Sequence, residues 1–452
     1  MNRFKKTFFA LIIVFLSLLF ISCNGVETPP ENTKSYRTKV RSGVSEVILE
    51  ELELGFRFFY ETASVDEASY GLIPDRFHAV GQDGGNPGDV SSIASVGFGL
   101  STLPIGIEAG WISREEGKAR ALGTLGTLGK MERTHGFWYH FVSMKTGKRV
   151  WNSEVSIIDS ALLIAGVLTV GRYFGGEVQK LAYKLYEEIE WDWYFDRNAN
   201  KFYMGYTPEK GFEGYWEGYA EQLLIFVLAA GSPKHSVDAQ AYRLMKLSSR
   251  YHNSTKDYGA FYSTYTGSLF THQFSHAWID FRSYVDEDGY NWFTNSVHAT
   301  EAAITYAKGL NGKYPGIHEN SWGMSACDGP GGYRGNYGSG PSAGNAHYVD
   351  GTVPAYGALG SIVFKPEEAI RAAENYRTYE QFWSKYGFKD SYNLRYNGQD
   401  WFASDIIGID KGISVLMIEN YLSEMIWKIF MEVEYVQKGL ENLNFSYVGE
   451  EK

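Results

Sequence analysis

Helical segments of two alternating kinds follow one another along most of this chain. A charged, amphipathic segment follows each apolar one, and the apolar segments begin near residues 91, 157, 219, 271, 351 and 412. A helix that is apolar on all sides belongs inside a protein, whereas a helix with one charged face belongs at the surface. Six such alternations predict an all-α fold, an (α/α)6 toroid with six inner and six outer helices in a single domain. Strand signals are few, and short β-hairpins are expected in loops such as 192–206 and 255–266.

The N-terminus has the layout of a secretory signal. A basic start precedes the apolar stretch Phe8–Ile21, and Cys23 follows a small residue. We expect residues 1–22 to be a lipoprotein signal peptide, Cys23 to be the lipidated first residue and residues 23–44 to be a flexible tether. The protein would then be exported and anchored in the bacterial cell envelope, in the periplasm or at the cell surface. A plain signal peptide or a signal anchor is the alternative.

The main domain is expected to span residues 45–440, followed by a C-terminal tail at 441–452. Cys327 is the other cysteine, so the lipidated form has no intramolecular disulfide and the fold depends on packing. Past Cys23 the sequence shows no apolar run of the roughly 18 residues needed to span a bilayer. We therefore expect membrane contact through the lipid anchor alone, and a monomer.

Charge and aromatic content both favour a neutral sugar as the ligand. The formal net charge is −11 and no basic block occurs, which argues against nucleic acid and against polyanionic substrates. Aromatic residues make up 16% of the chain, and many of them lie in glycine-rich loops. Exposed rings offer flat amphipathic faces to sugars, although aromatics at the rim of a large core would look the same in sequence.

Acidic and imidazole side chains gather just before or within the apolar segments. If the inner helices run in one direction, these side chains converge on one mouth of the toroid, where two carboxyl groups could face each other across a sugar. They are Asp89, Asp159, Glu217, Glu221, His272, His276, Asp350 and Asp410.

Glu217 and Glu221 lie four residues apart in GYWEGYAEQLLIFVLAAGSP, directly before an apolar stretch. Like charges at this spacing on a helix repel each other, so the arrangement costs stability unless something uses it. The pattern places Glu221 in the first turn of a core helix, where a carboxyl group can be partly desolvated. A capping acid on a solvated first turn is the alternative.

Several motifs in order resemble a known family. SIASVGFGLSTLPIGIEAGWI, HGFWYHF, WNSEVSIIDSALLIAG, GYAEQLLIFVLAAGSP, HQFSHAWIDFR, SWGMSACDGPGGY and GIDKGISVLMIENYLSEMIW are similar to the glycoamylase-like domain of bacterial secreted lipoproteins. That group includes the endo-β-1,2-glucanases of glycoside hydrolase family 144. The resemblance covers about residues 45–435 and implies an (α/α)6 toroid that hydrolyses glucans with inversion and without a metal, through acidic residues at the inner-helix loops.

The resemblance implies four catalytic candidates. Glu221 and Asp410 fall where the family has an essential glutamate and an essential aspartate. Asp159 stands where the family has a glutamate after a run of aspartates and glycines, and Glu154 lies nearby outside the helix. Asp159 also fits a capping box with Ser156, which is its alternative role. Asp410 could instead cap its helix or form a surface ion pair.

Further residues are expected to bind substrate, either as sugar platforms or as hydrogen-bonding groups. Each aromatic in this set could instead pack in the core. The set is Trp138, His140, Trp151, Trp216, Glu217, His276, Arg282, Trp322, Asp328, Tyr333 and Glu419.

Two motifs that suggest other chemistry are interpreted differently. His272 and His276 have a zinc-compatible spacing, but no third ligand is apparent, so we expect a buried pair or subsite histidines and no metal or cofactor. The glycine-rich DGPGGYRGNYGSG lacks the GK[ST] of a phosphate loop and is expected to cover the cleft, with Asp328 and Tyr333 near sugar. Arg282 is expected to pair with Asp280.

The sequence thus predicts an inverting, metal-independent glycoside hydrolase for a neutral glucan, with β-1,2-glucan or its oligosaccharides as the first choice. A glucoamylase-type α-glucan hydrolase and a non-catalytic glycan-binding surface lipoprotein are the alternatives. A polysaccharide lyase fits the acidic charge balance poorly.

Overall fold

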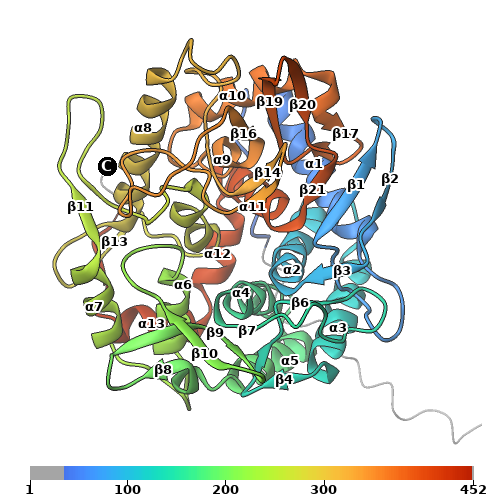
Figure 1. Ribbon diagram of the computed structural model, residues 1–452. Coiled ribbons are helices and arrows are strands. Elements are labelled where there is room, and N and C mark those ends of the chain that lie inside the picture. The colour runs from blue at the N-terminus through green and yellow to red at the C-terminus, as the bar shows by residue number, and fades with distance from the viewer. Residues whose placement is uncertain (1–34, 450–452) are drawn as a thin grey trace, which may run out of the picture. The chain divides into compact units, whose positions relative to one another are not determined.

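Thirteen α-helices and many short strands form the part of the chain that the structure, a computed structural model, describes, residues 35–449 (Figure 1). The predicted signal peptide, Cys23 and the start of the tether lie outside the described residues. The helices are α1 Glu46–Thr62, α2 Ile93–Glu108, α3 Arg114–Lys130, α4 Ile157–Phe174, α5 Gly176–Glu187, α6 Leu223–Ala230, α7 Gln240–Ser248, α8 Trp292–Gly309, α9 Ala355–Leu359, α10 Pro366–Arg377, α11 Gly408–Ser423, α12 Met425–Met431 and α13 Glu434–Asn442.

The strands are two to seven residues long, and none of the described sheets closes into a barrel. They are β1 Arg76–Val80, β2 Gly84–Pro87, β3 Val90–Ser92, β4 Arg133–Thr134, β5 Phe137–Trp138, β6 Phe141–Ser143, β7 Val155–Ser156, β8 Phe195–Asp196, β9 Lys201–Thr207, β10 Gly211–Tyr215, β11 Arg250–His252, β12 Phe261–Ser263, β13 Tyr284–Val285, β14 Cys327–Gly329, β15 Gly332–Arg334, β16 Thr352–Pro354, β17 Trp383–Ser384, β18 Gly387–Phe388, β19 Ser391–Tyr396, β20 Gln399–Phe402, β21 Asp405–Ile407 and β22 Ser446–Tyr447.

Apolar helices α2, α4, α6, α9 and α11 are buried along nearly their whole length, as the sequence predicts for inner elements. Four of them begin directly where a short strand ends: β3 leads into α2, β7 into α4, β16 into α9 and β21 into α11. Each of these strands therefore fixes where its helix starts and where the preceding loop lies.

The inner elements contact one another in chain order. Helix α2 packs against α4 and α11, α4 also packs against α6, and α11 packs against α9. Between α6 and α9 the chain forms two 3₁₀ turns, η2 Leu269–His272 and η3 Phe274–Ala277. Amphipathic helices α1, α3, α5, α8 and α10 each contact at least one of these inner elements. The described part of the chain is thus helix-rich, with apolar helices surrounded by amphipathic ones.

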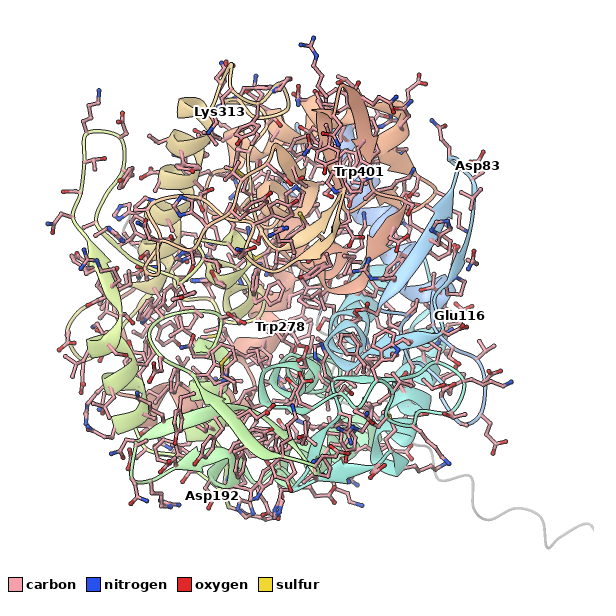
Figure 2. The ribbon with its side chains drawn as sticks, in the orientation of Figure 1. Asp83, Glu116, Asp192, Trp278, Lys313 and Trp401 are labelled. Carbon is pink, nitrogen blue, oxygen red and sulfur yellow. The ribbon has the colours of Figure 1, made fainter. Side chains whose placement is uncertain are left out.

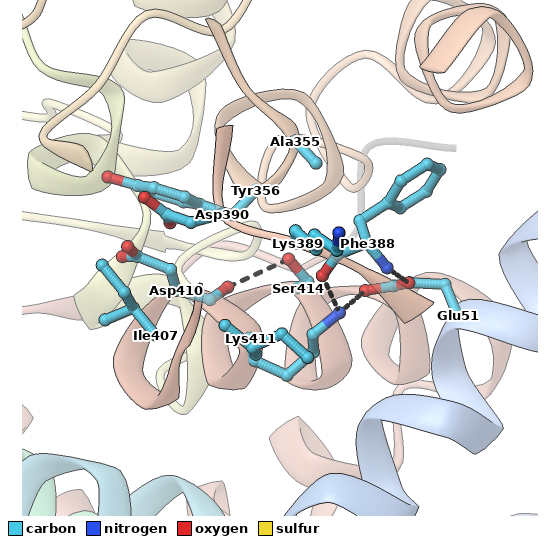
Figure 3. Close-up of a pocket in the computed structure, with 11 residues that line it drawn as sticks. Glu51, Ala355, Tyr356, Phe388, Lys389, Asp390, Ile407, Asp410, Lys411 and Ser414 are labelled. Carbon is cyan, nitrogen blue, oxygen red and sulfur yellow. Dashed lines mark hydrogen bonds and ion pairs between the residues drawn. The ribbon is translucent and has the colours of Figure 1, made fainter. Parts of the chain in front are cut away.

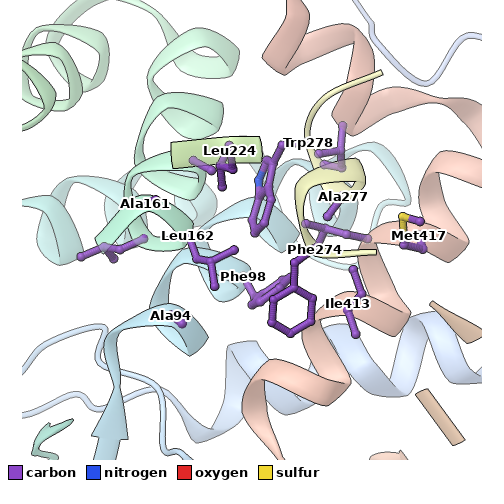
Figure 4. Packing of buried hydrophobic residues seen from close by; sticks show 14 of the residues in the cluster. Ala94, Phe98, Ala161, Leu162, Leu224, Phe274, Ala277, Trp278, Ile413 and Met417 are labelled. Carbon is purple, nitrogen blue, oxygen red and sulfur yellow. The ribbon is translucent and has the colours of Figure 1, made fainter. Parts of the chain in front are cut away.

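Side chains from five inner elements meet in one apolar core (Figure 4). The Trp278 ring lies 4.9 Å from the ring of Phe98 on α2, and Phe98 lies 5.7 Å from the ring of Phe274 on η3. Leu162 on α4 and Ile413 on α11 belong to the same cluster. Trp278 lies near the middle of the packed side chains, whereas Glu116 and Asp192 lie at the edge (Figure 2).

Glycines allow α2 and α4 to approach closely. A Cβ atom on Gly97 would lie 2.2 Å from the carbonyl oxygen of Leu162, and one on Gly166 would lie 2.0 Å from that of Gly97. Any side chain at either position would force the two helices apart. This contact outweighs the low intrinsic helix propensity of glycine.

The helix predicted from residue 219 begins later, at Leu223. Gly218 has φ +70°, and Gln222 holds a local turn by accepting from the Ala220 N–H at 2.7 Å and donating to the Gly218 carbonyl at 2.5 Å. The placement of Glu221 in a first helical turn is therefore wrong, and the residue lies in the loop before α6.

The helix predicted from residue 271 is also absent, since η2 and η3 take its place. In this segment, buried polar side chains form hydrogen bonds to neighbouring elements, and the backbone does not form a continuous α-helix. Ser275 Oγ donates to the Glu221 carbonyl at 2.6 Å and accepts from the Leu224 N–H at 3.0 Å. Gln273 Nε2 donates to the Gly357 carbonyl at 2.8 Å, which links this segment to α9.

The helix predicted near 351 is short, because only Ala355–Leu359 is α-helical. A predicted hairpin at 192–206 is confirmed by β8 and β9. The second predicted hairpin forms from β11 and β12, so its first strand starts at Arg250 and residues 253–260 form its connection.

The predicted tail and the described end of the predicted tether are both packed. Strand β22 pairs with β13, and Phe445 is 8% exposed. At the other end Arg37 forms an ion pair with buried Glu419, with 2.8 Å between Nη2 and Oε2. The domain thus extends past the predicted limits on both sides.

One described helix, α4, is long and apolar enough by composition to cross a membrane. The expectation that no such apolar run occurs past Cys23 is therefore wrong. Because 89% of the apolar window is buried inside the fold, α4 has the character of a core helix.

Candidate active site

Asp159 lies in the first turn of α4 and is 8% exposed. The Ser156 hydroxyl accepts from the Asp159 N–H at 3.1 Å and donates to Asp159 Oδ2 at 2.5 Å. The capping contact expected between these two residues is therefore present. It leaves the other carboxyl oxygen, Oδ1, directed to a different partner.

That partner is His140, which lies between two carboxyl groups. Its Nδ1 is 2.8 Å from Glu154 Oε1, and its Nε2 is 3.5 Å from Asp159 Oδ1. Burial opposes a charge on the ring, but the negative charges of Asp159 and Glu154 more than offset this and raise the pKa of His140 to about 9. At neutral pH a histidinium thus holds both carboxylates.

The three side chains also have the spacing of a possible metal site, with ligand atoms of His140, Glu154 and Asp159 all within 4.8 Å of one another. Metal binding needs a neutral imidazole with a free nitrogen. Here both ring nitrogens already face carboxylates, and the pKa of His140 is raised. This donor set fits a charged hydrogen-bonding bridge better than a metal centre.

Glu221 is held in the loop before α6 by the bond from Ser275 to its carbonyl oxygen. Part of its side chain is exposed, but its carboxyl group is surrounded by protein. Burial, together with the negative charge of Asp159, raises the pKa of Glu221 to about 7. The Glu221 carboxyl group therefore lies close enough to Asp159 to sense its charge.

Asp390 and Asp410 form a second pair of buried acids (Figure 3). Asp410 is in the first turn of α11, Asp390 lies just before β19, and each is 4% exposed. Their carboxyl groups share a hydrogen bond, and Asp390 Oδ2 also accepts from the Asp328 N–H at 2.6 Å. Burial raises the pKa of Asp390 to about 7, and burial with the Asp390 charge raises that of Asp410 well above its usual value. At neutral pH the pair shares a proton.

A buried ion pair lies directly behind these acids. Lys411 Nζ contacts Glu51 Oε1 and donates to the Phe388 carbonyl at 2.9 Å, and Glu51 Oε2 accepts from the Phe388 N–H at 2.9 Å (Figure 3). Both side chains are at most 3% exposed. The pair therefore fixes the backbone two residues before Asp390.

Asp75 and Arg76 connect the two halves of the site. Arg76 Nη1 is 2.6 Å from Asp328 Oδ2, and its Nε is 3.5 Å from Asp75 Oδ2. Burial raises the pKa of Asp75, which also senses the charges of Arg76, His140, Asp159 and Asp328. The groups from α4 and those from α11 thus belong to one electrostatic cluster.

Tyr333 belongs to the same cluster from the β14–β15 hairpin. Arg76 lies 5.8 Å from the centre of its ring, and the phenol interacts electrostatically with Asp410 and Asp390. The residue is 49% exposed, so its ring borders the solvent while its hydroxyl end is enclosed. Asp328 and Tyr333 therefore lie together beside the acid pair.

Two tryptophans predicted to bind sugar do not reach a cleft. Trp138 and Trp322 are both 0% exposed, and Trp138 Nε1 donates to the Leu128 carbonyl at 3.1 Å. A ring with no accessible face cannot stack on a sugar, so both predictions are wrong. Trp216 is 9% exposed and offers little surface, whereas Trp151 is 69% exposed.

Three other predicted substrate contacts, those of His276, Glu419 and Arg282, are wrong for reasons of position. His276 is 1% exposed, hydrogen-bonded to Ser296 and packed among phenylalanines. Burial lowers the pKa of His276 to about 3, so it is a neutral core residue, in line with the expected alternative of a buried histidine pair. His272 is likewise buried. Glu419 lies nine residues after Asp410 on α11, about 13 Å along the helix, where it pairs with Arg37.

Arg282 also lies at the far end of α11. It bonds to Asp280 at 2.7 Å, as expected, and to Glu424, the residue that ends α11, at 2.7 Å. Because Asp410 is at the opposite end of that helix, the predicted substrate contact of Arg282 is wrong.

Glu217 is exposed and ion-paired with Lys201. It lines a groove of about 440 Å³ together with Tyr219 and Tyr265. Burial and Asp159, rather than Glu217, raise the pKa of Glu221. Of the remaining predicted loop residues, Asp89 is exposed and Asp350 accepts from the Tyr337 hydroxyl at 2.7 Å.

Sequence reasoning missed Asp75, Arg76 and Asp390. Each lies in a short loop or at a strand end without helical periodicity. The signal that could have found them is an acid at a strand boundary, in IPDR and in FKDS. That signal is common in loops, so it is weak by itself.

A family model named Glycoamylase, described as "putative glucoamylase", matches residues 213–434. Among curated proteins, an exo β-1,2-glucooligosaccharide sophorohydrolase of Parabacteroides distasonis is 28% identical over 430 residues, covering 86% of this chain and 57% of that protein. The chain thus spans little more than half the length of that relative.

Among solved structures, the chain is likewise similar to putative glucoamylases and to β-1,2-glucanases. A putative glucoamylase from Bacteroides fragilis superposes with a TM-score of 0.79 at 28% identity, covering 90% of this chain and 100% of that one. An endo-β-1,2-glucanase from Chitinophaga pinensis, solved with sophorotriose and glucose, gives a TM-score of 0.76 at 28% identity, with 88% and 98% covered. Residues 213–434 are therefore similar to the glycoamylase family model, and most of the chain is similar to a curated β-1,2-glucooligosaccharide sophorohydrolase and to a solved endo-β-1,2-glucanase.

Proposed function

We propose that this protein is a glycoside hydrolase that cleaves β-1,2-linked glucan or its oligosaccharides by an inverting acid/base mechanism. The observation that carries the proposal is the cluster of Glu221, Asp159, Asp390 and Asp410, in which two groups have pKa values of about 7. Two bacterial proteins that it resembles are named for their action on β-1,2-glucooligosaccharides and on β-1,2-glucan.

Glu221 is proposed as the general acid. Cleavage of a glycoside requires one carboxyl group that still holds a proton at working pH. With a pKa of about 7, Glu221 is protonated on about half of the molecules at neutral pH and can give its proton to the departing sugar oxygen.

The Asp390–Asp410 pair is proposed as the general base. With one proton shared, the pair keeps one negative charge and can accept a proton from an attacking water. This assignment keeps the expected catalytic role of Asp410 and adds Asp390 to it.

Asp159 is proposed to stabilise the positive charge that develops on the sugar in the transition state. His140 and Ser156 orient its carboxylate, and its charge also helps to keep the proton on Glu221. Glu154 is proposed to hold His140 from the other side.

A neutral sugar is the proposed ligand of the surrounding groups. Asp328, Tyr333 and Glu217 can exchange hydrogen bonds with sugar hydroxyls, and the partly exposed Tyr333 ring can lie against a sugar face. The acidic cluster and the net charge of −11 disfavour a polyanionic chain.

We propose further that the described domain is an (α/α)6 toroid, with α2, α4, α6, the η2–η3 segment, α9 and α11 as inner elements. The order of contacts among these elements supports this arrangement, as does the position of α1 against α11 and α2. A toroid also accounts for catalytic candidates that come from separate loops yet meet in one cluster.

The test is incubation of the purified protein with β-1,2-glucan, soluble starch and an anionic polysaccharide, each with and without a chelator. We expect new reducing ends from β-1,2-glucan in both conditions. Cleavage of starch alone would favour the α-glucan hydrolase that the family description suggests. Binding without any product would favour a glycan-binding protein, and activity lost on chelation and restored by Zn²⁺ would overturn the metal-free mechanism.

Export and lipidation at Cys23 remain part of the proposal, together with a monomeric state. The lone cysteine after the apolar stretch of the N-terminus supports acylation. A fatty-acid analogue fed to producing cells should label the wild-type chain and not Cys23→Ser. Equal labelling of the two chains would contradict it.

A further inference from the structure

The turn that carries Trp151 keeps a large apolar ring in solvent by means of an unfavourable backbone. Trp151 has φ +55° and Asn152 has φ +52°, in the left-handed region that residues with side chains rarely adopt. For a bulky residue such as Trp151 this backbone is strained, and strain of this kind gathers at ligand-binding sites. The Trp151 side chain is 69% exposed, so its ring makes only limited packing contact within the described fold.

Arg149 holds the turn from within. Its Nε donates to the Ser153 carbonyl at 2.6 Å, and its Nη2 donates to the Asn152 carbonyl at 2.8 Å. The guanidinium is 14% exposed, and Glu209 pairs with both of its terminal nitrogens, at 2.7 and 3.0 Å. Only the planar, forked arginine head can make all of these bonds together.

The turn is directly connected to the catalytic cluster. The Trp151 ring packs edge-on against Phe141 at 5.3 Å, and Phe141 stacks on His140 at 3.7 Å. Trp151 is three residues before Glu154, at most about 10 Å along the chain. The exposed ring therefore lies within the span of a sugar unit or two from the carboxylates that His140 holds.

We propose that Trp151 is a preformed stacking platform for a glucose unit of the glucan that lies outside the catalytic centre, and that Arg149 is the residue that positions it. The inference rests on the proposed hydrolysis of β-1,2-glucan. It predicts that this turn makes the protein prefer longer glucan chains to short ones. The apolar face of a glucose ring covers the indole, and the turn needs no rearrangement because its strain is already present before binding.

The test compares β-1,2-glucooligosaccharides of increasing length in the full-length protein. For Trp151→Ala we expect kcat/KM to fall by about tenfold on long substrates, mainly through KM, and by much less on the shortest cleaved oligosaccharide. Trp151→Phe should restore part of the loss, because a smaller ring can still stack. Tyr447→Ala is the matched control, because it removes another aromatic side chain that is 66% exposed. Its effect on kcat/KM should not depend on the length of the substrate.

Arg149 variants separate positioning from general damage. Arg149→Lys keeps the charge but cannot form the forked contacts, so it should reproduce the loss seen for Trp151→Ala on long chains without a further loss when both changes are combined. Additive losses would mean that Arg149 acts independently of Trp151.

Tryptophan fluorescence supplies a readout independent of turnover. The difference signal between the wild type and Trp151→Phe should be quenched by acrylamide, and long glucan should protect it. Equal length dependence for the wild type and Trp151→Ala, with an active wild type, would overturn the platform. No cleavage of β-1,2-glucan by the wild type would instead refute the proposed function, while protection by glucan would still support the platform.

Discussion

At the scale of single residues, Glu221 is the side chain whose proton the proposed mechanism uses. Glu221→Gln keeps the size of the side chain but cannot release a proton at neutral pH, so kcat should fall by at least roughly a hundredfold. Glu217→Gln is the matched control, because Glu217 is exposed and does not affect the pKa of Glu221. Steady-state kinetics on β-1,2-glucan would measure both, and a normal kcat for Glu221→Gln would contradict the assignment.

The same substitution should change stability in a pH-dependent way. The pKa of Glu221 is about 7 in the folded protein and about 4.3 when unfolded, so between these values the folded state holds a proton that the unfolded state has lost. The contribution of Glu221 to stability therefore falls as the pH rises from about 4.3 to about 7. At pH 8 we expect Glu221→Gln to be more stable than the wild type by about 1–3 kcal/mol, with no gain at pH 4. Urea unfolding at both pH values checks this.

The contribution of His140 to stability should also fall as the pH rises, but over a higher pH range. The pKa of His140 is raised from about 6.5 to about 9, so its charge stabilises the fold fully below about pH 6.5, and this contribution is lost as the pH rises through about 9. His140→Gln should therefore be less stable than the wild type by about 1–3 kcal/mol at pH 6, and the difference should vanish by pH 10. A difference that stays constant with pH would mean that the ring acts through packing and not through its charge.

Individual residues also show how much of the candidate site could be predicted from the sequence. The sequence could point to four of the acids, because each lies in a recognisable motif or near the start of a core helix: Glu221, Asp159, Glu154 and Asp410. In the structure these acids and their neighbours form one electrostatic cluster. Trp138 and Trp151 look alike in sequence, but one is buried and the other is exposed. Exposure depends on which distant segments pack against a ring, and local sequence does not specify this.

At the scale of elements, the contact between α1 and α11 is held by the buried Glu51–Lys411 pair. Removing one partner leaves an uncompensated charge in the core, so Lys411→Met should cost about 3–5 kcal/mol. The double variant Glu51→Leu/Lys411→Met should recover most of this loss, because no charge remains buried. Denaturant unfolding of the single and double variants measures the difference, and losses that simply add would show that the two side chains do not act as a pair.

Kinetics of the double variant would also report on the acid pair. Glu51 and Lys411 fix the Phe388 backbone two residues before Asp390, so a stable double variant should still lose activity. We expect kcat to fall more than KM changes, because Asp390 belongs to the proposed general base. Unchanged kinetics would mean that the loop of Asp390 holds its place without the pair.

Element positions were easier to predict than element types. Helices α2, α4 and α11 follow the apolar pattern closely, because their burial on all sides excludes other conformations. The segment near residue 271 has the same apolar character but forms 3₁₀ turns, since buried Gln273 and Ser275 bond to α9 and to the loop before α6. Such polar contacts come from distant segments, so the periodic pattern cannot reveal them.

At the scale of the whole molecule, the count of alternating helices leads to the proposed toroid, and the toroid leads to a cleft of converging loops. Each step depends on the one before it. The six apolar segments of the sequence correspond to α2, α4, α6, the η2–η3 segment, α9 and α11. The convergence of Asp75, Asp159, Asp328 and Asp410 could not be read from the sequence, because it depends on how separate loops meet in space.

The anomeric form of the first product tests the central claim most directly. In an inverting reaction, a general acid and a base-activated water act on opposite faces of the sugar, so a β-linked glucan must release an α-anomer first. Proton NMR within minutes of mixing the protein with β-1,2-glucan distinguishes the two anomers before mutarotation mixes them. The account predicts an initial α-anomer that later equilibrates, and an initial β-anomer would contradict the acid/base roles of Glu221 and the Asp390–Asp410 pair.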